Sequence, residues 1–278
     1  MKFIAVAPNV EYLSWQVDLA AHKFLKCGYD KEDYWVLSPT QNHPWSGGDH
    51  ISPNIHKTDV KPWWEFLNIE HRENLAPICI QTSLKQIDLN PSTTYCLLDP
   101  DMFPIKHSVL NVPDGLIIHD NVYEKWHMRM HDENSFFKSM VDNKFNFSGF
   151  VPIIINGYTL SKILDDWIDL HIQCYWAVED DSRRWWAGMY SYNLACAKHG
   201  VNVIEKQLCG IPGYHSSLTE EMLFIHYSVD NSVLNKKNWE NELTKSNLDA
   251  RWNDEINSVD YEFLCVLCDW YLKSTTHP

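Results

Sequence analysis

The chain has 278 residues and a formal net charge of −14, and 45% of its residues are hydrophobic. This composition provides enough apolar side chains for a sizeable core and excludes a wholly disordered chain. The negative charge disfavours loose binding to nucleic acid or to an anionic membrane, although a local basic patch is compatible with it.

The first half of the chain alternates apolar runs with an amphipathic segment. Residues 2–7 predict a buried strand, residues 11–27 an amphipathic helix, and residues 34–37 a second strand. A strand, a helix and a strand in this order are typical of the opening of a nucleotide-binding α/β layer. Residues 38–60 predict a polar loop, because prolines and glycines interrupt them, and residues 74–89 predict a further helix.

The rest of the chain contains no linker and no internal repeat. We therefore expect a single domain, with a donor-binding half at about residues 1–110 and an acceptor half with a C-terminal helix at about residues 111–278. The further strands that we expect cover residues 95–99, 116–119, 150–156, 201–204 and 224–227. The further helices that we expect cover residues 159–176, 186–199 and 260–273.

The N-terminal apolar run stops at Pro8, which is too early for a signal peptide, and no window has the length of a transmembrane helix. The eight cysteines are scattered, mostly among apolar neighbours, which is typical of reduced core residues. The sequence thus predicts a cytoplasmic protein that does not bind membranes, located in the host cytoplasm if its source is viral.

The central strand, residues 95–99, leads into two carboxylates that flank Pro100. Side chains at i and i+2 of an extended segment point the same way, so we expect Asp99 and Asp101 to lie together. Pro100 takes the segment out of the sheet. Two hard oxygen ligands at a strand end suit Mg²⁺ or Mn²⁺, which there usually also holds a substrate diphosphate. The alternative interpretation is an ordinary Asp-Pro turn.

A late apolar run, residues 224–227, contains His226, and Lys236 and Lys237 follow it closely. Two carboxylates and a neutral imidazole can hold a divalent ion and leave positions open for two diphosphate oxygens. A nearby lysine supplies a point charge for the same diphosphate. This combination resembles a GT-A-type glycosyltransferase, in which a DxD motif and a late histidine bind the metal ion of a nucleotide sugar.

The resemblance extends to the peptidyl hydroxyproline O-arabinosyltransferases and peptidyl serine α-galactosyltransferases of plants and algae. Four stretches carry it, in the order of that group. They are Tyr12-Leu13-Ser14-Trp15-Gln16; Asn74-Leu75-Ala76-Pro77 together with Leu97-Leu98-Asp99-Pro100-Asp101-Met102-Phe103; Trp186-Ala187-Gly188-Met189-Tyr190-Ser191-Tyr192; and Ile225-His226-Tyr227. The resemblance implies a GT-A-like α/β fold, with a central and mostly parallel sheet flanked by helices.

The same resemblance implies a function. It implies a metal-dependent glycosyltransferase that moves a sugar of the arabinose, galactose or glucose class from a UDP-sugar to a hydroxyl acceptor, with retention of the anomeric configuration. The residues assigned to the donor side are Asp99, Asp101 and His226 for Mn²⁺ or Mg²⁺, and Lys236, Lys237 and Asn9 for the nucleotide sugar.

The chain departs from that group at Gly188, where the motif W-x-E-M-Y of the group has glutamate. If that glutamate serves the acceptor or the reaction centre, its role is lost here or passes to a nearby acidic residue. The candidates on the acceptor side are Asp180 and Asp181 as catalytic residues and Trp185, Trp186, Arg184 and Asn156 as substrate-binding residues. Simpler interpretations stay open: helix caps, core tryptophans, a solvated arginine and a turn asparagine.

The leading hypothesis for the acceptor is the hydroxyl of a hydroxymethylated pyrimidine in phage DNA. The altered motif, the abundant aromatic residues and the basic run 125–131 favour this hypothesis, and the charge of −14 opposes it. The alternatives are hydroxyproline or serine of a protein, the hydroxyl of a glycan, and the hydroxyl of a small molecule. A further hypothesis concerns a different class of function: Gly188 marks a lost activity, and the chain is a non-catalytic nucleotide-sugar-binding protein.

Overall fold

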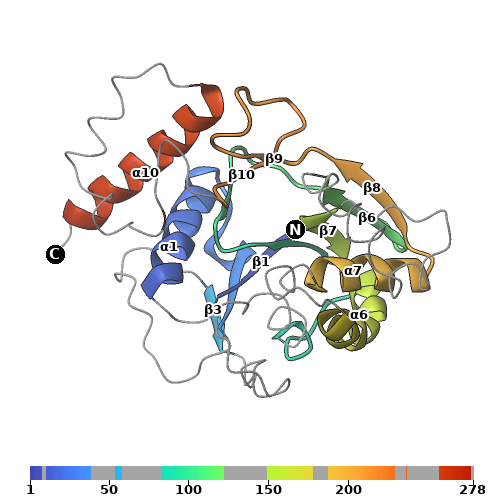
Figure 1. Ribbon diagram of the computed structural model, residues 1–278. Coiled ribbons are helices and arrows are strands. Elements are labelled where there is room, and N and C mark those ends of the chain that lie inside the picture. The colour runs from blue at the N-terminus through green and yellow to red at the C-terminus, as the bar shows by residue number, and fades with distance from the viewer. Residues whose placement is uncertain are drawn as a thin grey trace.

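The computed structural model describes residues 1–7, 11–38, 54–57, 83–121, 149–177, 187–228, 236 and 257–276. Within them, seven strands form a main sheet in the order β3-β2-β1-β4-β7-β6-β8 (Figure 1). These strands are β1 (Lys2–Val6), β2 (Tyr34–Ser38), β3 (Asn54–Lys57), β4 (Thr94–Leu98), β6 (Leu116–Asp120), β7 (Phe150–Asn156) and β8 (Asn202–Lys206).

Most neighbouring strands of the main sheet run parallel. The pairs β3–β2, β2–β1, β1–β4 and β6–β8 are parallel, and β7 alone runs antiparallel to its neighbours β4 and β6. The prediction of an α/β fold with a mostly parallel central sheet is therefore confirmed. One consequence positions the site: the carboxyl ends of β1, β2, β4, β6 and β8 all lie at the same edge of the sheet.

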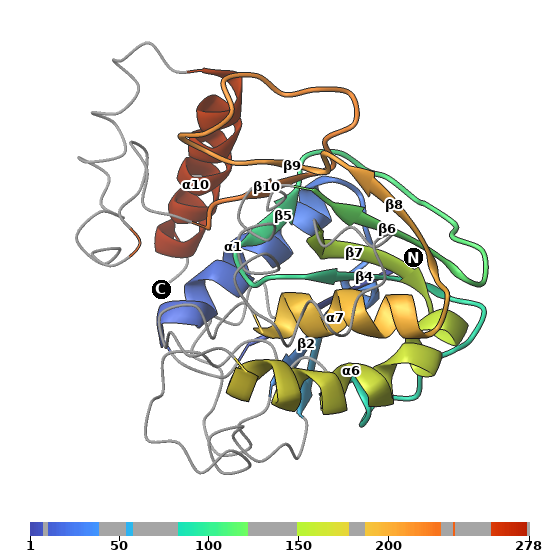
Figure 2. The same cartoon turned by 45° about the vertical axis from the view of Figure 1, so that its right-hand side comes forward.

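Helices cover both faces of the main sheet, as the two views show (Figure 1, Figure 2). On one face, Phe3 of β1 contacts Phe24 of α1. On the other face, His119 of β6 lies against Tyr192 of α7, which in turn packs against Trp167 of α6. The helices of the described residues are α1 (Glu11–Lys26), the 3-10 turn η1 (Lys31–Asp33), α6 (Gly157–Ala177), α7 (Ala187–Lys198) and α10 (Ser258–Thr276).

A second, smaller sheet lies on the α1 face of the main sheet. Its strands are β5 (Met102–Pro104), β10 (Phe224–His226) and β9 (Cys209–Gly210), in the order β5-β10-β9. Phe224 of β10 packs edge-on against Phe3 of the main sheet, and Phe103 of β5 stacks on Phe263 of α10. Aromatic rings thus join the small sheet to both the main sheet and the C-terminal helix.

Two predictions of secondary structure were wrong in part. Residues 38–60, predicted as a loop, contain β3, which adds a fourth parallel strand beside β2. The helix predicted at residues 74–89 falls largely outside the described residues, and its described end is helical only at residues 83–84. Strand β3 is short and lies among polar residues, so the sequence shows no alternation of apolar and polar residues by which it could be recognised.

Two further findings concern membranes and thiols. None of the helices in the described part of the chain combines the length and the apolar character that crossing a membrane requires. Seven cysteines lie among the described residues, and all seven are free thiols, including Cys265 and Cys268 of the C-terminal helix.

Candidate metal centre

The Asp99-Pro100-Asp101 segment forms a tight turn between the two sheets. Strand β4 is buried along its whole length, and Asp99 is the first residue beyond it, at the carboxyl edge of the main sheet. The amide N–H of Met102 donates to the carbonyl of Asp99 at 3.1 Å, which closes the turn and starts β5 of the small sheet. Both carboxylates therefore stand where the main sheet passes into the small one.

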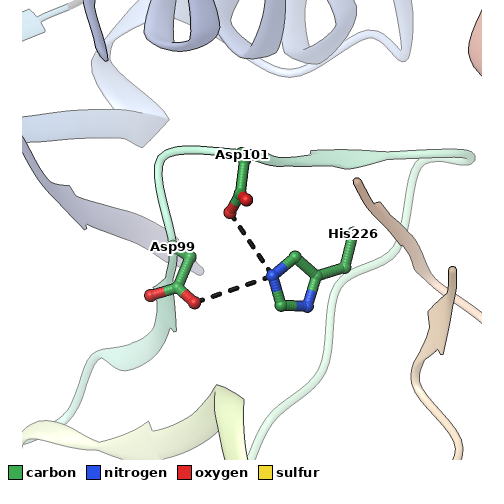
Figure 3. A group of neighbouring side chains, drawn as sticks. All are labelled: Asp99, Asp101 and His226. Atoms are coloured by element: carbon green, nitrogen blue, oxygen red, sulfur yellow. Dashed lines mark ion pairs between the residues drawn. The ribbon is translucent and has the colours of Figure 1, made fainter. Parts of the chain in front are cut away.

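Strand pairing brings His226 to this turn across a long stretch of sequence. β10 runs antiparallel to β5, with His226 opposite Met102, and the N–H of Tyr227 donates to the carbonyl of Asp101 at 3.2 Å. The Nε2 atom of His226 lies 3.4 Å from a carboxylate oxygen of Asp101 and 3.7 Å from one of Asp99 (Figure 3). The three side chains point at a common centre, with their ligand atoms within 4.8 Å of one another.

Lys236 closes one side of this group. Its ammonium donates to the second carboxylate oxygen of Asp101 at 2.6 Å and lies 5.2 Å from the centre of the Tyr227 ring. Lys236 is only 6% exposed, and His226 only 2%. A buried lysine needs a nearby anion, and Asp101 provides it.

Burial and mutual charge push the two carboxylates in opposite directions. Burial and the neighbouring Asp101 carboxylate raise the pKa of Asp99 to about 6. Burial opposes ionisation of Asp101 as well, but Lys236 and then His226 outweigh it and hold the pKa of Asp101 well below its usual range. For His226, the two carboxylates outweigh burial and raise the pKa. Such divergence between neighbouring groups is typical of functional sites.

The donor set fits a divalent ion. Two carboxylate oxygens and one imidazole nitrogen converge, which suits Mn²⁺ and, through the carboxylates, Mg²⁺. The carbonyls of Asp99 and Asp101 both accept backbone hydrogen bonds, from Met102 and Tyr227, so the turn that carries the two carboxylates is tied to the small sheet. The predicted trio of Asp99, Asp101 and His226 is thus brought together, while its occupation by an ion stays a prediction.

Asn156 lies elsewhere. It ends β7 opposite Thr94, the first residue of β4, and so stands at the amino edge of the main sheet, away from Asp99. Its side-chain oxygen accepts from the N–H of Thr159, and its amide donates to the Asp114 carboxylate. This is the geometry of a helix N-cap at the start of α6. Its predicted contact with substrate stays a prediction, at a place remote from the metal centre.

The remaining predicted site residues lie outside the described residues. They are Asn9, Asp180, Asp181, Arg184, Trp185, Trp186 and Lys237. Gly188, where the chain departs from the W-x-E-M-Y motif, is described: it is buried in the first turn of α7, and its carbonyl accepts from the indole N–H of Trp167 at 3.1 Å. Gly188 therefore packs against α6 from the first turn of α7.

One buried carboxylate at the same edge was missed. Asp120 ends β6 and is fully buried, and its carboxylate accepts from the N–H of Cys209 at 2.6 Å. The signal was available, because an apolar run ends in a carboxylate at Asp120 as it does at Asp99. In a mostly parallel sheet, such runs deliver their terminal side chains to a common edge.

Comparisons with known proteins agree with this architecture. The structure resembles that of the galactosyltransferase LgtC, solved with donor and acceptor sugar analogs, with a TM-score of 0.53 and 12% identity over 100% of this chain and 98% of LgtC. It also resembles the bifunctional glycosyltransferase WbbM, with a TM-score of 0.54 and 9% identity over 99% of this chain, which spans 51% of WbbM. No protein-family model and none of the curated proteins matches the sequence. At these identities the likeness shows the fold, and the chain has the fold of the GT-A glycosyltransferases.

Proposed function

We propose that the protein is a divalent-metal-dependent glycosyltransferase that moves a sugar from a UDP-sugar to a hydroxyl acceptor. The observation that carries the proposal is the convergence of Asp99, Asp101 and His226 at the carboxyl edge of the sheet. In open α/β sheets this edge is where ligands bind. The shared fold with two glycosyltransferases supports the same reaction class.

The residues of the site have separate tasks in this proposal. Asp99, Asp101 and His226 hold Mn²⁺ or Mg²⁺, and the ion when bound neutralises charge on the leaving diphosphate. Lys236 keeps Asp101 ionised through its contact of 2.6 Å, so that the carboxylate is ready to bind a cation at neutral pH. Lys237 and Asn9 complete the donor side, and retention of the anomeric configuration follows the family resemblance.

For the acceptor, we propose the hydroxyl of a hydroxymethylated pyrimidine in DNA. The proposal rests on the sequence: the glycine at position 188, the paired Trp185 and Trp186, and the basic run 125–131. Asp180 and Asp181 are the proposed catalytic residues of this acceptor side, and Arg184 the proposed contact to its phosphates. A hydroxyl of a protein or of a glycan is the alternative acceptor.

The test combines a panel of UDP-sugars with a panel of acceptors. We expect the protein with Mn²⁺ to release UDP from one sugar donor, and mass spectrometry to find the added sugar on hydroxymethylated DNA. Excess EDTA should stop both. Trp185→Ala and Trp186→Ala should lower transfer while leaving UDP-sugar hydrolysis nearly unchanged, since stacking on a base contributes about 1–3 kcal/mol per ring.

The possible outcomes of this test distinguish the acceptor, the catalytic activity and the metal dependence. Transfer to hydroxyproline, serine or a glycan, with DNA left unmodified at low salt, would overturn the DNA acceptor and keep the enzyme. Binding of a UDP-sugar without hydrolysis or transfer would favour the non-catalytic class, which the glycine at position 188 supports. Full activity in EDTA would remove the metal from the proposal.

A further inference from the structure

The three proposed metal ligands do not come from one sheet. Asp99 stands at the end of β4 in the main sheet, whereas His226 is the last residue of β10 in the small sheet. The distance between their ligand atoms therefore depends on how the two sheets are held against each other. A contact that fixes the small sheet to the main sheet also fixes the geometry of the metal centre.

Strand β10 has two neighbours, and each is tied to the main sheet in its own way. β5 continues directly from β4 through the Asp99-Pro100-Asp101 turn, so the chain itself anchors it. β9 pairs with β10 in parallel, with Cys209 opposite Phe224 and Gly210 opposite Ile225. β9 follows β8 after a two-residue connection, at a sharp corner where the chain leaves the main sheet.

The carboxylate of Asp120 braces that corner. Asp120 is the last residue of β6 and pairs with Lys206 at the end of β8, and a register shift between His119 and Asp120 interrupts the regular pairing of β6 with β7 at this point. From there its Oδ2 atom accepts the N–H of Cys209, the first residue of β9, at 2.6 Å. The carboxylate is fully buried. A short hydrogen bond from an N–H to a buried carboxylate is among the stronger hydrogen bonds in proteins.

We propose that Asp120 is a positioning residue for the metal centre: it fixes β9 to the end of β6 and thereby holds β10 and the imidazole of His226 at the correct distance from Asp99 and Asp101. The inference rests on the proposed function, because it requires that the Asp99, Asp101 and His226 cluster binds a divalent ion. Asp120 itself is not a ligand in this proposal. Its carboxylate is bonded to Cys209 and acts through the strand pair β9–β10.

The test measures the affinity for Mn²⁺ alone, by EPR titration of the whole protein, with thermal melting of every variant. Asp120→Ala should weaken Mn²⁺ binding about 10- to 100-fold, the usual loss for a residue that orients a ligand from outside the coordination shell. Asp120→Asn keeps an oxygen that can accept the Cys209 N–H, and should restore most of the affinity. It also keeps the test valid if Asp120→Ala does not fold.

A matched control is Asp260→Ala. The Asp260 carboxylate is buried too and accepts a backbone N–H, that of Gly213, at 3.0 Å, but it holds the loop after β9 rather than a strand that pairs with β10. This variant should lose stability and keep its Mn²⁺ affinity. If Asp260→Ala weakens Mn²⁺ binding as much as Asp120→Ala does, the effect is general loosening and the proposal fails.

The decisive measurement is a double-mutant cycle with His226→Ala. If Asp120 acts through His226, Asp120→Ala should change Mn²⁺ affinity less than about 3-fold once the imidazole is gone, because coupled residues are not additive. An equal loss in both backgrounds would mean that Asp120 acts through its charge on the ion, and would overturn the positioning role. Wild-type affinity in Asp120→Ala would do the same. Absence of Mn²⁺ binding in the wild type would instead overturn the proposed function, and this inference with it.

Discussion

Polar side chains lie at both ends of strand β4, but their interactions differ between the two ends. At the amino end, Asn156 and Asp114 bind each other, and Asn156 also caps helix α6 through the N–H of Thr159. At the carboxyl end, Asp99 and Asp101 lie beside each other, and in the described part of the chain His226 and Lys236 offset their charge. At the amino end the Asp114 carboxylate accepts a hydrogen bond from Asn156, whereas at the carboxyl end two carboxylates lie side by side.

The difference between the two ends of β4 shows how polar residues that support the fold can be distinguished from polar residues that bind a ligand or a metal ion. Two neighbouring carboxylates are costly to bury, and here the cost appears as a pKa of about 6 for Asp99. The backbone is also closely packed at the amino end, because a Cβ atom at Gly157 would collide with the carbonyl of Asn90. Concentrated charge that folding does not require is a signal of binding or catalysis.

The largest expected effect is that of Asp101→Asn at the carboxyl end. The amide keeps the shape of the side chain but loses the charge that binds the cation. We expect sugar transfer to be abolished and Mn²⁺ affinity to fall more than about 100-fold, since loss of a ligand exceeds the usual loss for a residue behind one. Isothermal titration with Mn²⁺ and a transfer assay measure both.

The matched control for this variant is Asp114→Asn at the amino end. It removes the same charge from the other end of the strand and should leave Mn²⁺ binding and transfer unchanged. Equal losses in the two variants would show that the overall negative charge, rather than the cluster, attracts the ion.

The second expected effect concerns Lys236→Met, which removes the ammonium from Asp101. Because folding lowers the pKa of Asp101, the ionised carboxylate stabilises the fold at pH values above its unfolded-state pKa, which is near 3.9. This contribution is lost as the pH falls toward the lower pKa of the folded state. Without Lys236 the contribution is lost at neutral pH too, and a buried carboxylate is left without its cation. We expect the free energy of unfolding at pH 7 to fall by about 3 kcal/mol in urea denaturation.

Lys23→Met provides the comparison for that measurement. Lys23 pairs with Glu262 at 2.5 Å between α1 and α10. The Lys23 side chain is more exposed than that of Lys236, and the Glu262 side chain is more exposed than that of Asp101. A loss of no more than about 1 kcal/mol is expected there. If the two lysine variants lose the same stability, the buried pair of Lys236 and Asp101 contributes no more to folding than a surface pair, and the contrast between the two ends of β4 fails.

The third expected effect is on His226. His226→Ala should weaken UDP binding at least about 10-fold when Mn²⁺ is present and leave it nearly unchanged in EDTA, because the imidazole acts through the ion. His226→Phe restores the ring but not the nitrogen and should not rescue binding. His171→Phe, at another buried histidine in α6, should leave UDP affinity unchanged. Rescue by His226→Phe would show that the residue only fills the core.

Much of the fold could be predicted from periodicity alone. The helix predicted at residues 11–27 is α1 at Glu11–Lys26, and the strand predicted at residues 95–99 is β4 at Thr94–Leu98. Such elements are long or strongly apolar, so their pattern is visible locally. β9, with two residues, and β3, in a segment that resembles a loop, carry no such pattern.

The site was predictable only in part, for a physical reason. The spacing of Asp99 and Asp101 is local and can be read along the chain. His226 reaches them only because β10 pairs with β5 from more than a hundred residues away. The sequence did not predict that pairing, and the assignment of His226 to the metal ion rested on the resemblance to GT-A-type glycosyltransferases. The contact between Lys236 and Asp101 and the brace of Asp120 on Cys209 depend on tertiary packing, so no spacing in the sequence indicates them.

The smallest expected effect belongs to Asn156 at the amino end of β4. Asn156 pairs with Thr94, five residues before Asp99, so about 16 Å separates it from the metal centre at about 3.3 Å per residue. Asn156→Ala removes the cap of α6 and should lower the free energy of unfolding by about 1 kcal/mol in urea, with Mn²⁺ and UDP affinity unchanged. Asn156→Asp keeps the oxygen that accepts the Thr159 N–H, and should cost less unless repulsion from Asp114 cancels the gain. A variant with wild-type stability and weakened transfer would show that Asn156 contacts substrate, as the sequence first indicated, and the contrast between the two ends of the strand would no longer hold.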